Sequence, residues 1–187
     1  MKIHKKRFKT PTKQSLTNAA LHYLERYAAS EASLRKVLKN RLRRAAMRIP
    51  EFADDLDARQ NLESAIEEII ASHKKSGVIN DGSFAEMKIH SLRRKGKSRR
   101  AIKMKLAEKG INAAIVDEAI TQHEQFTTPE EAEMQAAFAF AKRKKLGKFG
   151  KSPDDPNKRR KDFAALAREG FSSNIARAVL EYTEDQE

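Results

Sequence analysis

Two Gly-Lys-Ser triplets, at residues 96–98 and 150–152, are the features of this sequence closest to a phosphate-binding motif. A P-loop needs G-x-x-x-x-G-K-[ST] between a strand and a helix, because both glycines let backbone N–H groups surround the phosphate. Ser91 and Lys145 stand where the first glycine would be, and no strand-like run precedes either triplet. We therefore interpret both triplets as basic turns between helices and predict no nucleotide hydrolysis.

Other side chains that could carry out catalysis lack the spacing that it requires. The five histidines show no H-E-x-x-H or comparable ligand spacing, and the chain contains no cysteine. Asp54, Asp55 and Asp57 lie close together at the start of an acidic helix, where the helix dipole favours them without any catalytic role. We therefore predict a protein that is not an enzyme, with no catalytic residue, no metal site and no cofactor.

Positive charge is the strongest chemical signal in the chain. Lys and Arg number 39 against 26 Asp and Glu, which gives a net charge of +13 and indicates a polyanionic partner. Residues 35–48 hold seven Lys or Arg and residues 93–105 hold eight, with no acid in either run, whereas residues 51–68 hold seven acids. Because uncompensated repulsion destabilises a fold unless an anion relieves it, we predict that the basic runs bind phosphate.

The residues predicted to contact DNA or a DNA-bound protein filament come from the basic runs at 35–48, 93–109 and 142–161. They are Arg35, Lys36, Lys39, Arg43, Arg93, Arg94, Lys95, Lys97, Arg99, Arg100, Lys103, Lys142, Arg143, Lys144, Lys145, Arg159 and Arg160. We expect weak, salt-dependent binding to single- or double-stranded DNA, because Lys and Arg that neutralise phosphates release counterions.

Composition also predicts where the chain resides. The absence of cysteine is typical of a reducing compartment. No apolar run approaches the roughly 20 residues that span a bilayer, and the basic start MKIHKKRFKT lacks the apolar stretch of a signal peptide. We expect a cytoplasmic protein without a membrane partner, and a monomer.

Apolar spacing predicts helices throughout, since Gly and Pro fall between the apolar-periodic segments. The first helix is predicted from Leu16 to Tyr27, and Ser30 offers an N-cap for the second. Pro50 suits the first turn of a third helix that continues through Ile70. These three helices form a first unit.

The same signals predict two further units. Ser83 and Glu86 stand three apart, as in a capping box, and Ser98 precedes the next helix. A third helix is predicted from about Asn112 to Phe126, after which the sequence Thr-Pro-Glu-Glu at 128–131 combines a cap, a first-turn Pro and a capping-box Glu.

Comparison of the chain with itself indicates that these units are related. A shift of 60 residues aligns Leu106 and Gly110 with Leu166 and Gly170, and a shift of 68 aligns Ser30 with Ser98. We predict an all-α fold, an elongated array of three tandem three-helix repeats. The predicted divisions are a basic tail (1–14), repeat 1 with an extended connection between its second and third helices (15–77), repeat 2 (78–127) and repeat 3 with a loop at 147–157 (128–187).

The segment GVINDGSFAEMKIHSLRRKGKSRRAIKMKLAEKGI, residues 77–111, resembles the central part of the RecX family, regulators of the RecA recombinase. The family has a Gly-apolar-apolar-Asp-Asp turn, a Phe-Ala helix, a basic Gly-Lys turn and a helix ending in Lys-Gly-Ile. The resemblance extends more weakly over most of residues 16–182. It departs from the family at Asn80, where Asp is usual, and in the insertion at residues 41–64.

This resemblance implies three tandem three-helix repeats that bind along the groove of the RecA–DNA filament. It implies inhibition of recombinase activity in homologous recombination, DNA repair and SOS control. An alternative is an autonomous, largely sequence-nonspecific nucleic-acid-binding protein with units like helix-turn-helix readers. The helix starts carry Arg and Lys, which suit phosphate better than base edges. That chemistry favours the modulator or a nonspecific form of the alternative.

Overall fold

The computed structural model describes residues 9–152 and 155–182, and the regular structure within those ranges is entirely helical, as predicted. Residues 1–8 of the predicted tail, residues 153–154 of the predicted loop and residues 183–187 lie outside the described ranges. The helices are α1 (Lys13–Leu24), α2 (Glu31–Ala46), α3 (Pro50–Asp54), α4 (Leu56–Lys75), α5 (Asp81–Arg94), α6 (Arg99–Ala107), α7 (Ala113–His123), α8 (Pro129–Lys144), the 3-10 turn η1 (Gly147–Phe149), α9 (Pro156–Glu169) and α10 (Ser173–Glu181).

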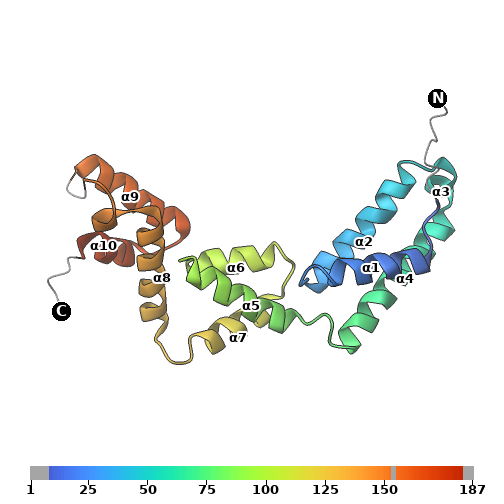
Figure 1. Ribbon diagram of the computed structural model, residues 1–187, viewed down its shortest axis with the longest axis horizontal. Helices are drawn as coiled ribbons and strands as arrows, with labels where there is room; N and C mark the ends of the chain where they lie inside the picture. The colour runs from blue at the N-terminus through green and yellow to red at the C-terminus, as the bar shows by residue number, and fades with distance from the viewer. Residues whose placement is uncertain (1–8, 153–154, 183–187) are drawn as a thin grey trace. The chain divides into compact units, whose positions relative to one another are not determined.

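The chain divides into two compact units after Phe84, in the first turn of α5. In the first unit, α1, α2 and α4 pack side by side, and α3 contacts both α2 and α4 (Figure 1). Their apolar stripes meet in one core, which contains the fully buried side chains of Leu16, Leu34, Leu38 and Ile66. Burial of each such side chain contributes about 1.5–3 kcal/mol relative to leaving it in water.

The second unit contains α5 from Ala85 onward and α6 to α10. Buried side chains of α5, α6 and α7 include Ile89, Ile102 and Ile120. The helix α8 packs against α9 and α10, and the core between them includes Phe140 and Phe171, whose ring centroids lie 6.1 Å apart (Figure 1).

Three predicted helix starts are confirmed by their hydrogen bonds. The Ser30 hydroxyl accepts a bond from the backbone N–H at the third position of α2, and the Ser98 hydroxyl does the same for α6 at 3.0 Å. Thr128 and Glu131 form the complete capping box at the start of α8. Each cap satisfies a backbone donor that the helix itself leaves unpaired.

Other predicted boundaries were wrong. Asn80, not Ser83, caps α5: its side-chain oxygen accepts from the Ser83 N–H at 3.0 Å, so Gly82 falls inside the first turn of the helix. The helix predicted from Pro50 to Ile70 is two helices, because Asp55 leaves the helical conformation and its side chain caps α4 instead. The remaining errors are at helix ends, since α1 ends at Leu24 and α7 at His123.

The 60-residue repeat is visible in the turn that follows α6 and the turn that follows α9. Gly110 and Gly170 both have left-handed φ angles, +72° and +102°. In each turn the glycine N–H bonds to a carbonyl three residues earlier, and the next N–H bonds five residues back, to Leu106 or Leu166. These bonds satisfy the last carbonyls of each helix in the same way. The predicted sequence offset therefore corresponds to a repeated local structure.

Candidate nucleic-acid interface

The Gly-Lys-Ser turn at residues 96–98 is a joint between helices. Gly96 has a left-handed φ of +66°, and a Cβ atom there would lie 2.3 Å from the backbone nitrogen of Phe140 in α8. The Ser98 hydroxyl donates to the Glu169 carbonyl at 2.6 Å, and the Lys97 ammonium lies 2.8 Å from the Glu169 carboxylate. These three residues hold α5 and α6 against α8 and the end of α9, so the turn does not present its lysine to a phosphate.

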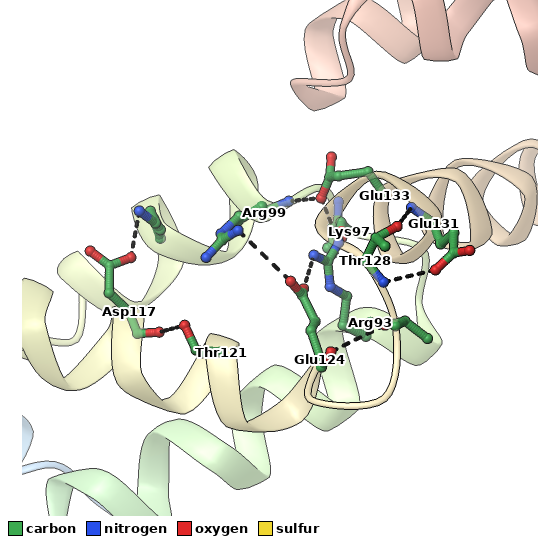
Figure 2. Close-up of polar contacts among 11 residues, drawn as sticks. Arg93, Lys97, Arg99, Asp117, Thr121, Glu124, Thr128, Glu131 and Glu133 are labelled. Atoms are coloured by element: carbon green, nitrogen blue, oxygen red, sulfur yellow. Dashed lines mark hydrogen bonds and ion pairs between the residues drawn. The ribbon is translucent and has the colours of Figure 1, made fainter.

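Arg93, the last-turn arginine of α5, lies at the centre of a buried ion cluster (Figure 2). Its guanidinium contacts Glu124 at the end of α7 and Glu133 in α8, the latter at 2.7 Å. The side chains of Arg93, Glu124 and Glu133 are only 8%, 5% and 17% exposed. Glu133 also accepts the Arg99 N–H at the first residue of α6, at 2.6 Å. The cluster therefore joins four helices. Its two carboxylates neutralise the guanidinium of Arg93 within the protein.

The same capping arrangement occurs in the first unit, 68 residues earlier. There the Asp81 carboxylate accepts the N–H of Glu31, the first residue of α2, at 2.9 Å. In both cases the first helix of the next predicted repeat supplies the acid, Asp81 of α5 or Glu133 of α8. An acid at a helix N-terminus is favoured by the helix dipole and by the unpaired N–H groups.

Arg35 connects the basic helix α2 of the first unit to the acidic helix α4. Its guanidinium donates to Glu67 of α4 at 2.8 and 2.9 Å and to Glu31 at 2.7 Å. Lys74 lies 2.6 Å from Glu31. Hydrogen bonds from Arg35 hold the pKa of both Glu31 and Glu67 below the ordinary value for glutamate, and Lys74 adds to the effect at Glu31.

These depressed pKa values predict that acid weakens the first unit. Glu31 and Glu67 stabilise the fold above their ordinary pKa near 4.5, and this contribution disappears as the pH falls through their lowered pKa values. Urea unfolding measured from about pH 6 to about pH 3 should show declining stability. The decline should be shallower in Arg35→Gln than in wild type, whereas Lys36→Gln, which changes an exposed neighbour, should keep the wild-type slope. Equal slopes in both variants would contradict the assignment.

The structure divides the seventeen predicted contact residues into two groups. Six pair with carboxylates of their own chain: Arg35, Arg93, Lys97, Arg99, Lys103 and Arg159. The others are exposed and form no ion pair within the described residues: Lys36, Lys39, Arg43, Arg94, Lys95, Arg100, Lys142, Arg143, Lys144, Lys145 and Arg160. The premise that the run at 93–105 is uncompensated was therefore wrong for Arg93, Lys97, Arg99 and Lys103, because acids distant in sequence neutralise them.

Sequence reasoning missed four arginines that the structure places at a groove, Arg26, Arg41, Arg44 and Arg48. Arg41 and Arg44 belong to the run at 35–48, but they were not among the predicted contacts. Both are exposed and line a groove between α1 and α2, together with Tyr23 and Tyr27. Their spacing of three residues places them on one face of α2, and this spacing is the signal that could have separated them from the rest of the run.

The described residues were also compared with the requirements of a membrane span and of a metal site. Among the helices of residues 9–152 and 155–182, none has the length and apolar character needed to cross a membrane. The described side chains likewise contain no group of three or more potential metal ligands.

Solved structures with the same arrangement of helices define the class of fold. A crystal structure of RecX from Lactobacillus salivarius aligns with 90% of this chain and 94% of its own, with a TM-score of 0.63 and 23% identity. A second crystal structure, of regulatory protein RecX, aligns with 91% of this chain and 72% of its own, with a TM-score of 0.65 and 22% identity. The chain is thus an all-helical protein built from helical repeats.

Sequence relatives identify the family within that class. Residues 80–120, which contain α5, α6 and most of α7, match the family model for the second three-helix domain of RecX. Regulatory protein RecX of Myxococcus xanthus is 40% identical over 177 residues, which cover 92% of this chain and 89% of the relative. Regulatory protein RecX of Streptomyces lividans is 33% identical over 139 residues, which cover 73% and 70%. The chain belongs to the RecX family of regulatory proteins.

Proposed function

We propose that this protein regulates the RecA recombinase, mainly as an inhibitor, by binding the groove of the RecA–DNA filament through its exposed basic side chains. Membership of a family of regulatory proteins supports a regulatory role. The observation that carries the proposal is that all three predicted repeats expose cations that no acid of the described chain neutralises. Examples are Arg43 on α2, Lys95 after α5 and Lys144 on α8.

Several weak basic contacts on one chain suit a polymeric target. A filament repeats the same subunit and the same phosphate spacing, so binding of one repeat holds the next at high effective concentration. The affinity of the whole protein for the filament can then exceed that of any single contact. We propose a non-enzymatic, cytoplasmic role of this kind, with weak salt-dependent affinity for DNA itself.

Salt dependence measures how many of these cations meet phosphate. We expect log K for DNA to fall linearly with log salt, and the slope to be reduced by roughly 1.4–1.8 in Arg94→Glu/Lys95→Glu, which removes two phosphate contacts. Arg94 is the last residue of α5 and Lys95 follows it; both side chains are exposed, so reversal leaves the buried cluster intact. Reversal of Arg99 would be a poorer test, because Arg99 pairs with Glu124. The measurement is fluorescence anisotropy of labelled DNA across a salt series.

A matched control has the same change in net charge outside the basic runs. Lys75→Glu/Arg177→Glu alters two exposed cations on α4 and α10 and should keep most of the wild-type slope. Equal reductions in the two double variants would mean that overall charge, not the proposed interface, determines DNA binding.

The filament assay separates the proposal from the alternative of a general nucleic-acid-binding protein. Substoichiometric protein should slow ATP hydrolysis and strand exchange by RecA on preformed filaments, and Arg94→Glu/Lys95→Glu should require higher concentrations for the same effect. If preformed filaments are unaffected and an unrelated basic protein blocks assembly equally well, simple competition for DNA explains the result. The modulator proposal would then be wrong.

A further inference from the structure

A groove of about 940 Å³ lies between α1 and α2 in the first unit. Its floor is apolar and includes Ala19, Val37, Ala45 and Ile49. Its cations are Lys9, Arg26, Arg41, Arg44 and Arg48, and no carboxylate is among the described residues that line it. An apolar surface with positive charge at its edges suits a ligand that is anionic on one side and flat and apolar on the other.

Two arginines of this groove, Arg41 and Arg44, are exposed and are not among the cations that pair with acids. Arg41, Arg44 and Arg48 follow one another at intervals of three and four, so they form a single row along α2 and just beyond its end. Arg35 lies on a different face of α2, where it pairs with Glu67 of α4. The helix therefore uses one face to bind the acidic helix of its own unit and turns another to the groove.

Two tyrosines provide flat surfaces in the same groove. Tyr23 is in the last turn of α1, and Tyr27 lies just after the helix, with 57% of its surface exposed. Their ring centroids are 5.3 Å apart and the rings are tilted by 42°. An aromatic ring left this exposed is not required for the core, and aromatic rings beside a basic groove are the surfaces on which unpaired bases stack.

We propose that this groove binds a short stretch of single-stranded nucleic acid, with one or two bases stacked on Tyr27 and Tyr23 and the phosphates beside Arg41 and Arg44. A duplex fits this chemistry less well, because its bases are already stacked and paired. An acidic peptide could satisfy the arginines, but it supplies no flat ring systems to the tyrosines. This inference deepens the proposed function by assigning a binding site for the unpaired strand.

The experiment measures binding of full-length protein to a labelled oligothymidylate of roughly 16 nucleotides, without recombinase. Tyr27→Ala should weaken binding roughly 5- to 100-fold, as expected for loss of one stacked base. Tyr27→Phe keeps the ring and should bind within about twofold of wild type. Arg44→Ala should weaken binding and reduce the slope of log K against log salt by roughly 0.7.

Two controls keep the result interpretable. Leu56→Ala removes another exposed apolar side chain of the same unit, 70% exposed and outside the groove, and should leave binding unchanged. A blunt duplex of the same length should lose less than about twofold on Tyr27→Ala, since its bases cannot stack on the ring. Equal losses for single strand and duplex would overturn the stacking assignment. The midpoint of thermal unfolding of Tyr27→Ala should match that of the wild type. A lower midpoint would mean that the loss of binding results from a loss of folding.

Photo-cross-linking gives a second readout that does not depend on a variant. An oligonucleotide carrying 5-iodouracil should cross-link to the peptide that contains Tyr23 and Tyr27. Cross-links confined to other peptides would overturn the inference, as would binding of polyglutamate with the same sensitivity to Tyr27→Ala. Because these assays contain no recombinase, they can fail while inhibition of RecA persists, or succeed while inhibition is absent. The inference and the proposed function are therefore tested separately.

Discussion

Replacing Arg93 with methionine is expected to lower the free energy of unfolding of the second unit by about 3–5 kcal/mol. Methionine fills much of the same space but leaves Glu124 and Glu133 without their shared cation, and their side chains are 5% and 17% exposed. Glu124 would keep only the more distant Arg99, at 3.8 Å, and Glu133 only the Arg99 N–H, so both buried carboxylates would retain the cost of desolvation with much less compensating attraction. Urea unfolding followed by circular dichroism measures the change.

Two comparisons test the cause of that loss. Arg94→Met alters the adjacent, exposed arginine and should change stability by less than about 0.5 kcal/mol. The triple variant Arg93→Met/Glu124→Gln/Glu133→Gln removes the buried charges together and should recover a large part of the loss, because neutral amides are less costly to bury. If the triple variant is no more stable than Arg93→Met, unpaired charge is not the reason for the destabilisation.

The cluster also explains why truncation is a poor way to assign function to the third predicted repeat. A chain cut near Phe126 would lose Glu133 and Glu169, the partners of Arg93 and Lys97. The remaining segment would then expose cations that are occupied in the intact protein. Point variants in the exposed groups, such as Arg94 and Lys95, test binding without this complication.

Gly96→Ala is expected to have the second large effect. The new Cβ would lie 2.3 Å from the Phe140 nitrogen and 2.7 Å from the Ala136 oxygen, and both are backbone atoms of α8 that cannot rotate away. Overpacking of this kind costs typically 1–3 kcal/mol, and the left-handed φ of +66° adds about 1–2 kcal/mol for a residue with a Cβ. Thermal or urea unfolding should therefore show a total loss of roughly 2–5 kcal/mol.

Two other glycines separate steric clash from backbone strain. Gly77 has a similar φ of +74°, and a Cβ there would meet nothing within 4 Å. Gly110 lies in the same unit as Gly96, has a φ of +72° and is exposed. Alanine at either position should cost only the strain, about 1–2 kcal/mol. A loss in Gly96→Ala no larger than in these controls would show that the close contact with α8 is not needed for stability.

Much of the local structure could be predicted because its causes are local. A serine or threonine cap bonds to an N–H within the next three residues, so Ser30, Ser98 and Thr128 identify their helix starts without reference to the rest of the fold. The turns at Gly110 and Gly170 repeat at 60 residues for the same reason. The wrong boundaries arose where two local signals competed, as when Asn80 capped α5 in place of Ser83.

The excess of positive charge, the helical class and the likeness to the RecX family could be obtained from the sequence alone, since each depends on composition, periodicity or motif. Only the tertiary structure decided which cations remain exposed. Arg93 meets Glu124 and Glu133, and Lys97 meets Glu169, across 31, 40 and 72 residues of chain. Because an ion pair depends on distance in space and on desolvation, neither of which a count of charges contains, the basic runs look uniform in sequence but divide in the folded protein into structural and exposed groups.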